Sequence, residues 1–114
     1  MKSITLERYK RAGRSQVAVG RFTFHVQRPT PYEMLRARED GGFGLDFVAA
    51  HVVGWEGVKE SDLIPSGDPE PLEFDAALFA AWMEDEPDLW GPISEALKKS
   101  YADYEEAREA RGKL

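Results

Sequence analysis

The chain is organised around the segment Phe47-Val48-Ala49-Ala50-His51-Val52-Val53-Gly54-Trp55-Glu56-Gly57-Val58. Phe47, Ala50 and Val53 recur at helical spacing, so this part of the segment can bury one face of a helix. Gly54 follows where a helix C-cap favours a residue that accepts a positive φ. We therefore predict a helix over residues 45–53, then a Gly-Trp-Glu-Gly corner that packs or docks Trp55.

The composition is that of one soluble domain. The 114 residues suffice for a single hydrophobic core, and 42% of them are hydrophobic and 32% charged. No apolar run approaches the ~20 residues that span a membrane, and no signal-peptide core follows the basic N-terminus. Cysteine is absent, which excludes disulfides and thiolate metal sites. We expect one domain over residues 1–114, located in a cytoplasm, with no membrane partner.

Charge is distributed unevenly along the chain. Residues 1–28 hold seven of the 15 basic side chains but one of the 21 acidic ones, so their net charge is +6 and that of the remainder is −12. A basic segment could contact nucleic acid, but we favour the interpretation that it offsets the acidic body or forms a solvated hairpin. The acidic body disfavours nonspecific binding of nucleic acid by the whole chain.

The N-terminal segment has the alternating pattern of strands. Ile4 and Leu6 alternate with polar residues, and a second alternation shifts parity at Gly20, which predicts a β-bulge there. We predict an antiparallel hairpin formed by residues 3–9 and 15–27. Two strands alone are marginal in water, so the apolar face of the second strand must lie against helices. That face consists of Phe22, Phe24 and Val26.

The clearest local pattern is a helix start at Thr30. Thr30 can cap, Pro31 suits the first helical position, and Glu33 completes a capping box. This pattern predicts a helix over residues 31–39 that ends before two glycines. Its inward residues are expected to be Tyr32, Leu35 and Met34.

Two further helices follow an acidic loop. Residues 59–73 hold three prolines, one glycine and many acids, so we predict a loop. Its acids lack the ligand spacing of an EF-hand, so we do not expect calcium binding. Asp75 caps a predicted helix over residues 75–84 that is apolar nearly all round. After a turn that opens at Pro87, a terminal helix is predicted over residues 92–110. Its inward stripe is Ile93, Leu97, Tyr101 and Tyr104.

These elements predict an α+β fold in which the N-terminal antiparallel hairpin packs on a small bundle of about four helices. The hairpin occupies residues 3–27, and residues 31–58 are helical and end in the Gly-Trp-Glu-Gly corner. The acidic loop spans residues 59–73, and the C-terminal helices lie within residues 74–110.

No residue pattern points to catalysis. The two histidines, His25 and His51, have no spacing with carboxylates that argues for a metal site. A Ser/His/Asp set and a Gly-rich phosphate loop are both missing from the sequence, and the acidic run 84–86 is expected to be solvated. We therefore predict a protein that is not an enzyme and uses no cofactor and no metal.

Two segments resemble a known family. They are Pro29-Thr30-Pro31-Tyr32-Glu33-Met34 and residues 47–58, with the core Val-Val-Gly-Trp-Glu-Gly-Val. Together they resemble the small tail assembly chaperones of long-tailed, siphovirus-like bacteriophages and prophages. The likeness continues through the acidic loop, Leu72-Glu73-Phe74, the turn at Pro87 and the terminal helix, and covers about residues 20–105. The basic segment before residue 20 and the charged tail match less well.

The resemblance implies a non-enzymatic role in virion assembly. Such chaperones bind the tape-measure protein, keep it soluble, help to recruit tail-tube subunits and leave before the virion is complete. The expected partners are therefore the tape-measure protein and the tail-tube protein, in the cytoplasm of a bacterial host and not in the mature virion. Neither nucleic acid nor a membrane is an expected partner, and the sequence leaves self-association open.

A chaperone for a long helical chain needs an apolar surface on a soluble body. Aromatic residues and Met favour binding hot spots and adaptable contacts. For each candidate the competing interpretation is ordinary core, which is favoured for any single large apolar residue. The candidates for partner binding are Trp55, Val58, Phe79, Trp82, Met83 and Trp90.

The alternative function is an acidic inhibitor or DNA mimic that binds a host or phage nucleic-acid enzyme. Residues 59–95 hold eleven acids and one lysine, which is the pattern that supports this alternative. The two functions differ in their response to salt. A mimic loses its partner steeply as the salt concentration rises, whereas an apolar chaperone contact does not.

The resemblance also implies that a second, longer product is made by a ribosomal slip into the −1 frame. The heptanucleotide G-GGA-AAG permits such a slip and reads as a codon that ends in G, then Gly, then Lys. Arg111-Gly112-Lys113 can be encoded in this way. The same three residues are also an ordinary helix ending, with basic side chains at the negative end of the dipole and Gly at the cap.

Overall fold

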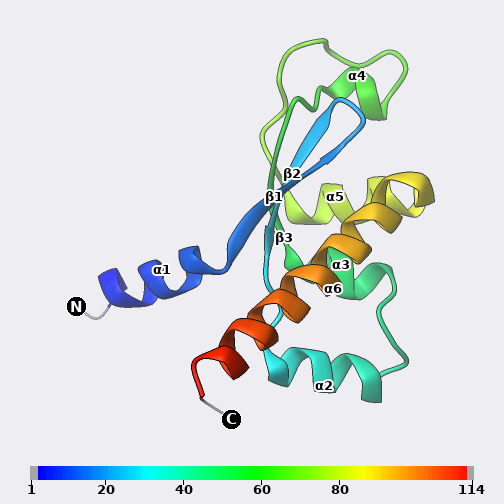
Figure 1. The fold of residues 1–114 in the computed structure, drawn as a ribbon. Helices are drawn as coiled ribbons and strands as arrows, with labels where there is room; N and C mark the ends of the chain where they lie inside the picture. Colours follow the sequence, from blue (N-terminus) through cyan, green and yellow to red (C-terminus); the bar gives the residue numbers. More distant parts are fainter. Residues whose placement is uncertain (1–2, 113–114) are drawn as a thin grey trace.

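A computed structural model describes residues 3–112, and in this part of the chain six helices accompany one three-stranded sheet (Figure 1). The predicted α+β class is confirmed, with an antiparallel hairpin packed on helices. Lys113, on which the slip expectation partly rests, lies outside the described residues. The elements are α1 Ser3–Ala12, β1 Arg14–Val19, β2 Phe22–Gln27, α2 Pro31–Glu39, α3 Leu45–His51, β3 Val52–Glu56, α4 Glu60–Leu63, α5 Ala76–Glu84 and α6 Pro87–Ala110.

The sheet is antiparallel throughout, in the order β1-β2-β3. Val19 pairs with Phe22, so Gly20 and Arg21 form a two-residue turn, with Gly20 at φ 61°. A glycine with positive φ at the first central position is what a type II′ hairpin turn requires. The predicted bulge at Gly20 is therefore wrong, because the shift of parity marks the turn between two strands.

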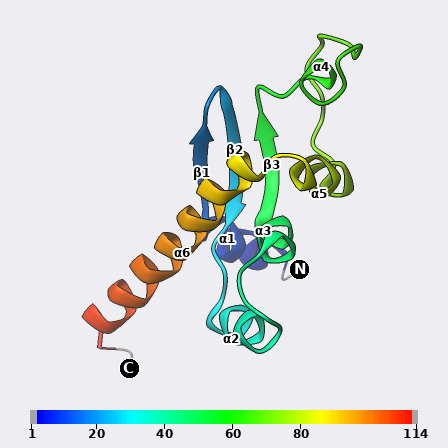
Figure 2. The ribbon, with the colours of Figure 1, turned by 90° about the vertical axis from the view of Figure 1, so that its right-hand side faces the viewer.

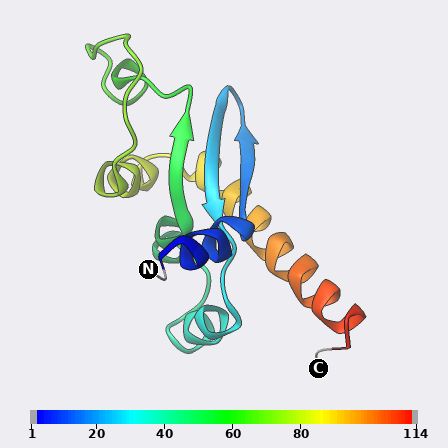
Figure 3. The ribbon, with the colours of Figure 1, turned by 90° about the vertical axis from the view of Figure 1, so that its left-hand side faces the viewer.

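The prediction of a strand over residues 3–9 is also wrong, because these residues belong to helix α1. The hairpin closes within residues 14–27, so no strand is left to pair with this segment. Ile4 and Leu6 produced the alternation, but their exposed fractions are 72% and 50%, and α1 contains no buried residue. Figures 1 and 3 show α1 as an arm that leaves the body at the start of β1.

The central segment is half helix and half strand. Helix α3 ends at His51, not at Val53, and the next five residues form strand β3, which pairs antiparallel with β2. β-branched residues favour the strand that the free edge of β2 offers. The predicted C-cap at Gly54 is therefore wrong, because Gly54 lies inside β3. The glycine with a positive φ is Gly57, at 81°.

A β-bulge does occur in this sheet, but it lies in β3. His25 pairs with Gly54 and Val26 pairs with Val52, which leaves Val53 as the extra residue. Bulges turn a side chain away from the regular alternation. Val53 accordingly has an exposed fraction of 41%, although Val52 beside it is buried.

Helix α2 has the predicted bounds and the predicted capping box. The Thr30 amide donates to Glu33 Oε1 at 2.9 Å, and the Glu33 amide donates to Thr30 Oγ1 at 3.0 Å. Of its three expected inward residues only Met34 is buried, whereas Tyr32 and Leu35 are 64% and 51% exposed. Helix α2 lies at one end of the molecule, where fewer elements cover it (Figure 1).

The C-terminal half follows the prediction with shifted bounds. The loop over residues 59–73 contains the short helix α4, and Asp75 caps α5 by accepting from the Leu78 amide at 2.9 Å. Helix α6 begins at Pro87 because Pro is preorganised for the first helical position. The predicted start at residue 92 is therefore wrong, and Pro92 lies inside α6.

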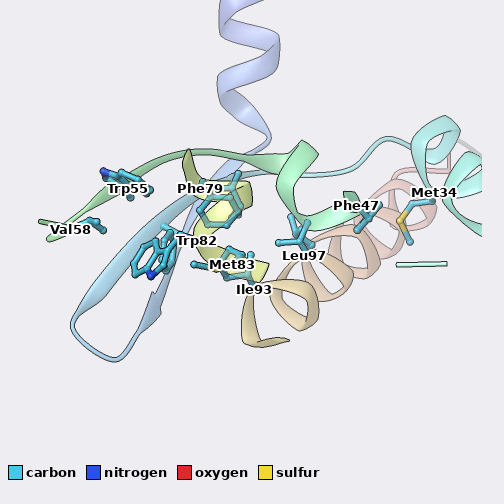
Figure 4. Packing of buried hydrophobic residues seen from close by; sticks show 13 residues of the cluster. Met34, Phe47, Trp55, Val58, Phe79, Trp82, Met83, Ile93 and Leu97 are labelled. Atoms are coloured by element: carbon cyan, nitrogen blue, oxygen red, sulfur yellow. The ribbon is translucent and has the colours of Figure 1, made fainter. Parts of the chain in front are cut away.

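Helices α3, α5 and α6 pack together on one face of the sheet, and α6 crosses β1 and β2 (Figure 2). The hydrophobic core fills this interface (Figure 4). The predicted face of Phe22, Phe24 and Val26 does lie against helices. The Phe24 ring packs edge-on against the Phe79 ring of α5, with 5.7 Å between the ring centroids. The buried hydrophobic residues are Phe24, Val26, Met34, Phe47, Val48, Val52, Trp55, Val58, Phe79, Trp82, Met83, Ile93 and Leu97.

Candidate partner-binding groove

A groove of about 560 Å³ lies between α2 and α3. Its floor consists of small or apolar residues from both helices, namely Ala37, Leu45, Phe47 and Ala50. Three glycines of the connecting loop, at positions 41, 42 and 44, complete one side. Because the two alanines and the three glycines have a small side chain or none, the backbone of a partner helix could approach closely at these positions.

The glycines shape the groove by turning the chain. Gly41 and Gly42 have φ values of 108° and 116°, which L side chains rarely adopt. The Gly42 amide donates to the carbonyl of Ala37 at 2.7 Å and closes the end of α2. The chain therefore reverses tightly after Asp40, and α3 returns beside α2.

A buried histidine joins the two helices. His51 is 5% exposed, and its Nδ1 lies 2.8 Å from the carbonyl oxygen of Phe47. Its Nε2 lies 3.1 Å from Glu33 Oε1. The Phe47 carbonyl and the Glu33 carboxylate are both hydrogen-bond acceptors, so each ring nitrogen of His51 faces an acceptor.

Glu33 therefore has two structural roles. It completes the capping box of α2 and pairs with the His51 ring on α3. Partial burial acts to raise the pKa of Glu33, but the hydrogen bonds from Thr30 and His51 outweigh burial and hold the pKa below its ordinary value of 4.5. The ionised carboxylate is thus part of the folded structure at neutral pH.

The rim of the groove is acidic, with one cation. Glu33, Asp40 and Asp46 line it together with Arg36, whose Nη2 lies 3.9 Å from Asp40. No group of three or more His, Asp or Glu side chains within residues 3–112 could hold a metal ion. The arrangement offers an apolar floor and a charged rim, which suits binding of a polypeptide.

The structure places the predicted partner-binding residues together, but in the core. The exposed fractions of Trp55 and Trp82 are 8% and 7%. Their rings pack edge-on, with 5.9 Å between the ring centroids. Val58, Phe79 and Met83 are 1% exposed or less, and Trp90 is partly buried. In this fold they form the interior and not an outer face.

Sequence reasoning missed the groove, although a pattern for it is present. Gly41 and Gly42 predict the end of the helix over residues 31–39, and they belong to the segment Asp-Gly-Gly-Phe-Gly of residues 40–44. Three glycines in four positions between two helices also indicate a tight return that brings the helices side by side. The exposed large hydrophobic residues are Ile4, Leu6, Tyr9, Tyr32, Leu35, Val53 and Ile64.

Two of the eleven acids that suggest a DNA mimic, Glu60 and Asp62, serve local contacts. Glu60 accepts from the Asp68 amide, and Asp62 accepts from the Lys59 amide, each at 2.8 Å. Asp62 also pairs with Arg21 on the hairpin turn. These two carboxylates order their own loop, so they are engaged within the protein.

Comparisons with known proteins add no assignment. No family model matches the chain, and no curated protein and no solved structure is significantly similar to it. Among residues 3–112, every helix is too short or too polar to cross a membrane.

Proposed function

We propose that this protein is a non-enzymatic phage tail assembly chaperone that binds the tape-measure protein in the groove between α2 and α3. One observation carries the proposal. The two segments that resemble the chaperone family, residues 29–34 and 47–58, are separated by residues 35–46 in the chain, and both contribute residues to this groove. Glu33 of the first segment contacts His51 of the second, and both line the groove.

The groove suits a helical segment with an apolar stripe, which is what a tape-measure chain presents. Ala37 and Ala50 permit close approach, while Leu45 and Phe47 supply apolar contact area. The acidic rim surrounds this floor with charge, and the net charge of −6 favours solubility of a complex. A binding segment that is apolar on its own would thus be covered.

The proposal also covers the second partner of the chaperone and its location in the cell. The tail-tube protein is a second partner, recruited to the bound tape-measure chain. The complex forms in the cytoplasm of the bacterial host, and the chaperone is absent from the finished virion. Neither nucleic acid nor a membrane takes part in this scheme.

Coexpression with the tape-measure protein of the same genome tests the proposal. Ala50 is an exposed alanine in the groove, so Ala50→Arg fills the groove without disturbing the core. Ala81→Arg, at an exposed alanine of α5, is the matched control. We expect the original protein and Ala81→Arg to raise the soluble fraction of the tape-measure protein, and Ala50→Arg to lose this effect.

The two ways of failing are distinct. If the original protein leaves the tape-measure chain insoluble and does not copurify with it, the proposed function is wrong. If Ala50→Arg acts like Ala81→Arg, the function stands but the groove is not the binding site.

A further inference from the structure

A second groove, of about 320 Å³, lies at the base of the α1 arm and differs in chemistry from the first. Its apolar residues are Leu6, Tyr9 and Val53, with exposed fractions of 50%, 69% and 41%. Its charged residues are the three cations Lys10, Arg14 and Arg28. None of the described residues that line it is a carboxylate.

The fold holds this basic groove open. Gln27 Nε2 donates to the Lys10 carbonyl at 2.8 Å, and the Arg28 amide donates to the Gly13 carbonyl at 2.7 Å. These bonds fix the last turn of α1 against the end of β2, so the arm projects at a defined angle. The bulge in β3 turns Val53 outward toward the arm.

An apolar patch surrounded by cations fits an occupant that is apolar and acidic. The chain itself carries such a segment in the tip of the loop that follows α4. Ile64 is 49% exposed there, and the acids Asp68 and Glu70 are exposed close to it in sequence. We call this segment, residues 64–70, the acidic tip.

The acidic tip and the basic groove lie at opposite ends of the sheet. Helix α1 precedes β1, and the acidic tip follows β3, which runs parallel to β1 because both pair antiparallel with β2. Figure 1 shows α4 beyond the hairpin turn and α1 at the other end of the strands. A chain therefore cannot place its own acidic tip in its own basic groove.

We propose that copies of this protein associate head to tail, with the acidic tip of one copy seated in the basic groove of the next. Ile64 meets Leu6, Tyr9 and Val53, while the acids of the tip face the three cations of the groove. The contact joins two different surfaces, so it is heterologous and does not close at two copies. It leaves the α2–α3 groove free and stands independently of the proposed function.

Lys10 and Arg14 of the groove and both acids of the tip are exposed, so their attraction is screened by salt, whereas Arg28 is half-buried against the Tyr104 ring. The association is expected to weaken as the salt concentration rises. The apolar contacts are not screened, so they should contribute to the association at every salt concentration. Because one copy offers one groove and one tip, larger assemblies form as the protein concentration increases.

Sedimentation velocity with two complementary variants tests the proposal. Leu6→Ser/Tyr9→Ser removes the apolar part of the groove, and Ile64→Ser removes that of the tip. We expect the original protein to form concentration-dependent assemblies larger than a dimer, and each variant alone to be monomeric. An equimolar mixture of the two variants retains one intact groove and one intact tip per pair, so it should form a 1:1 dimer and nothing larger.

Tyr32→Ser is the matched control, because Tyr32 is 64% exposed but lies on α2. It should assemble like the original protein. Thermal melts followed by circular dichroism check that the variants fold, and Tyr9→Ser alone replaces the double variant if that one melts early. A monomeric original protein overturns the proposal, as does a mixture of variants that stays monomeric. Assemblies of unchanged size in both variants also overturn it.

Discussion

His51 Nε2 lies 3.1 Å from Glu33 Oε1, and this contact joins the first turn of α2 to the last turn of α3. The Glu33 carboxylate also accepts from the Thr30 amide at 2.9 Å. One side chain thus caps a helix, pairs with a buried ring and lines the α2–α3 groove. The shape of the groove and the ionisation of Glu33 are therefore coupled.

This coupling predicts a pH-dependent contribution to stability. Burial acts to raise the pKa of Glu33, but the hydrogen bonds from Thr30 and His51 lower it below 4.5. A carboxylate with a depressed folded-state pKa stabilises the fold above its unfolded-state pKa, and that contribution is lost as the pH falls through the folded-state pKa. Glu33→Gln should lower the melting temperature at neutral pH, and the difference from the original protein should shrink as the pH falls below the ordinary pKa of 4.5 and vanish below the lowered folded-state pKa.

Glu39→Gln is the control, because Glu39 is an exposed carboxylate on the same helix. It should leave the melting temperature unchanged at every pH. A constant gap between Glu33→Gln and the original protein across the whole range would show that the Glu33 charge is not coupled to folding.

Two buried tryptophans allow a matched prediction about hydrogen bonding. Trp55 Nε1 donates to the Leu72 carbonyl at 2.7 Å, whereas Trp82 Nε1 has no partner among the described residues. Replacing either by Phe removes a similar volume, but Trp55→Phe also leaves a carbonyl unsatisfied, at a cost of about 1–3 kcal/mol. We expect Trp55→Phe to lower the free energy of unfolding more than Trp82→Phe, as measured by urea denaturation. Equal losses would contradict a role for the Trp55 hydrogen bond.

Truncating Trp55 fully should be more severe. The Trp55 ring packs edge-on against the rings of Phe74 and Trp82, with 5.1 Å and 5.9 Å between the ring centroids. These contacts join β3 to α5 and to the residue before its cap. Trp55→Ala should therefore cost about 3–5 kcal/mol in the free energy of unfolding. An unchanged urea midpoint would place the indole outside the core.

The predicted docking pair on α5 gives a test of core against surface. Phe79 and Met83 are fully buried, at 0% exposure each. Truncation to Ser costs at least the ~2–5 kcal/mol per residue of large-to-small core changes, and a small domain has about 5–15 kcal/mol in total. Phe79→Ser/Met83→Ser should consequently fail to fold, as seen by loss of the near-ultraviolet circular dichroism. A double variant that folds normally but no longer binds the tape-measure protein would show that Phe79 and Met83 form a docking face.

The sequence predicted the features that depend on neighbouring residues. Thr30, Pro31 and Glu33 determine the start of α2 by local hydrogen bonding, so its bounds were correct. Asp75 determines the start of α5 in the same way. The apolar face of β2 was also correct, because alternation over six residues identifies the buried side without knowledge of the partner.

The missed features depend on contacts distant in sequence. Residues 3–9 show strand-like alternation, yet they become helix because the hairpin forms without them. Val52 and Val53 continue a helical pattern, but they belong to β3 because this segment forms backbone hydrogen bonds with the free edge of β2. The α2–α3 groove likewise arises from the packing of two helices, which no local pattern specifies.

Gly54 and Gly57 allow a direct test of how the central segment folds. A helix cap at Gly54 would make that glycine the sensitive one, whereas the structure assigns the positive φ of 81° to Gly57. A Cβ at Gly57 would lie 3.0 Å from the backbone oxygen of Arg21, whereas a Cβ at Gly54 would meet the movable His25 ring at 3.3 Å. Gly57→Ala should cost about 1–2 kcal/mol from the left-handed backbone alone, and more from the contact. Gly54→Ala, in extended backbone, should stay within about 1 kcal/mol of the original protein. Urea denaturation of both variants distinguishes a strand at Gly54 from a helix end there. A larger loss of stability for Gly54→Ala than for Gly57→Ala would indicate that a helix ends at Gly54.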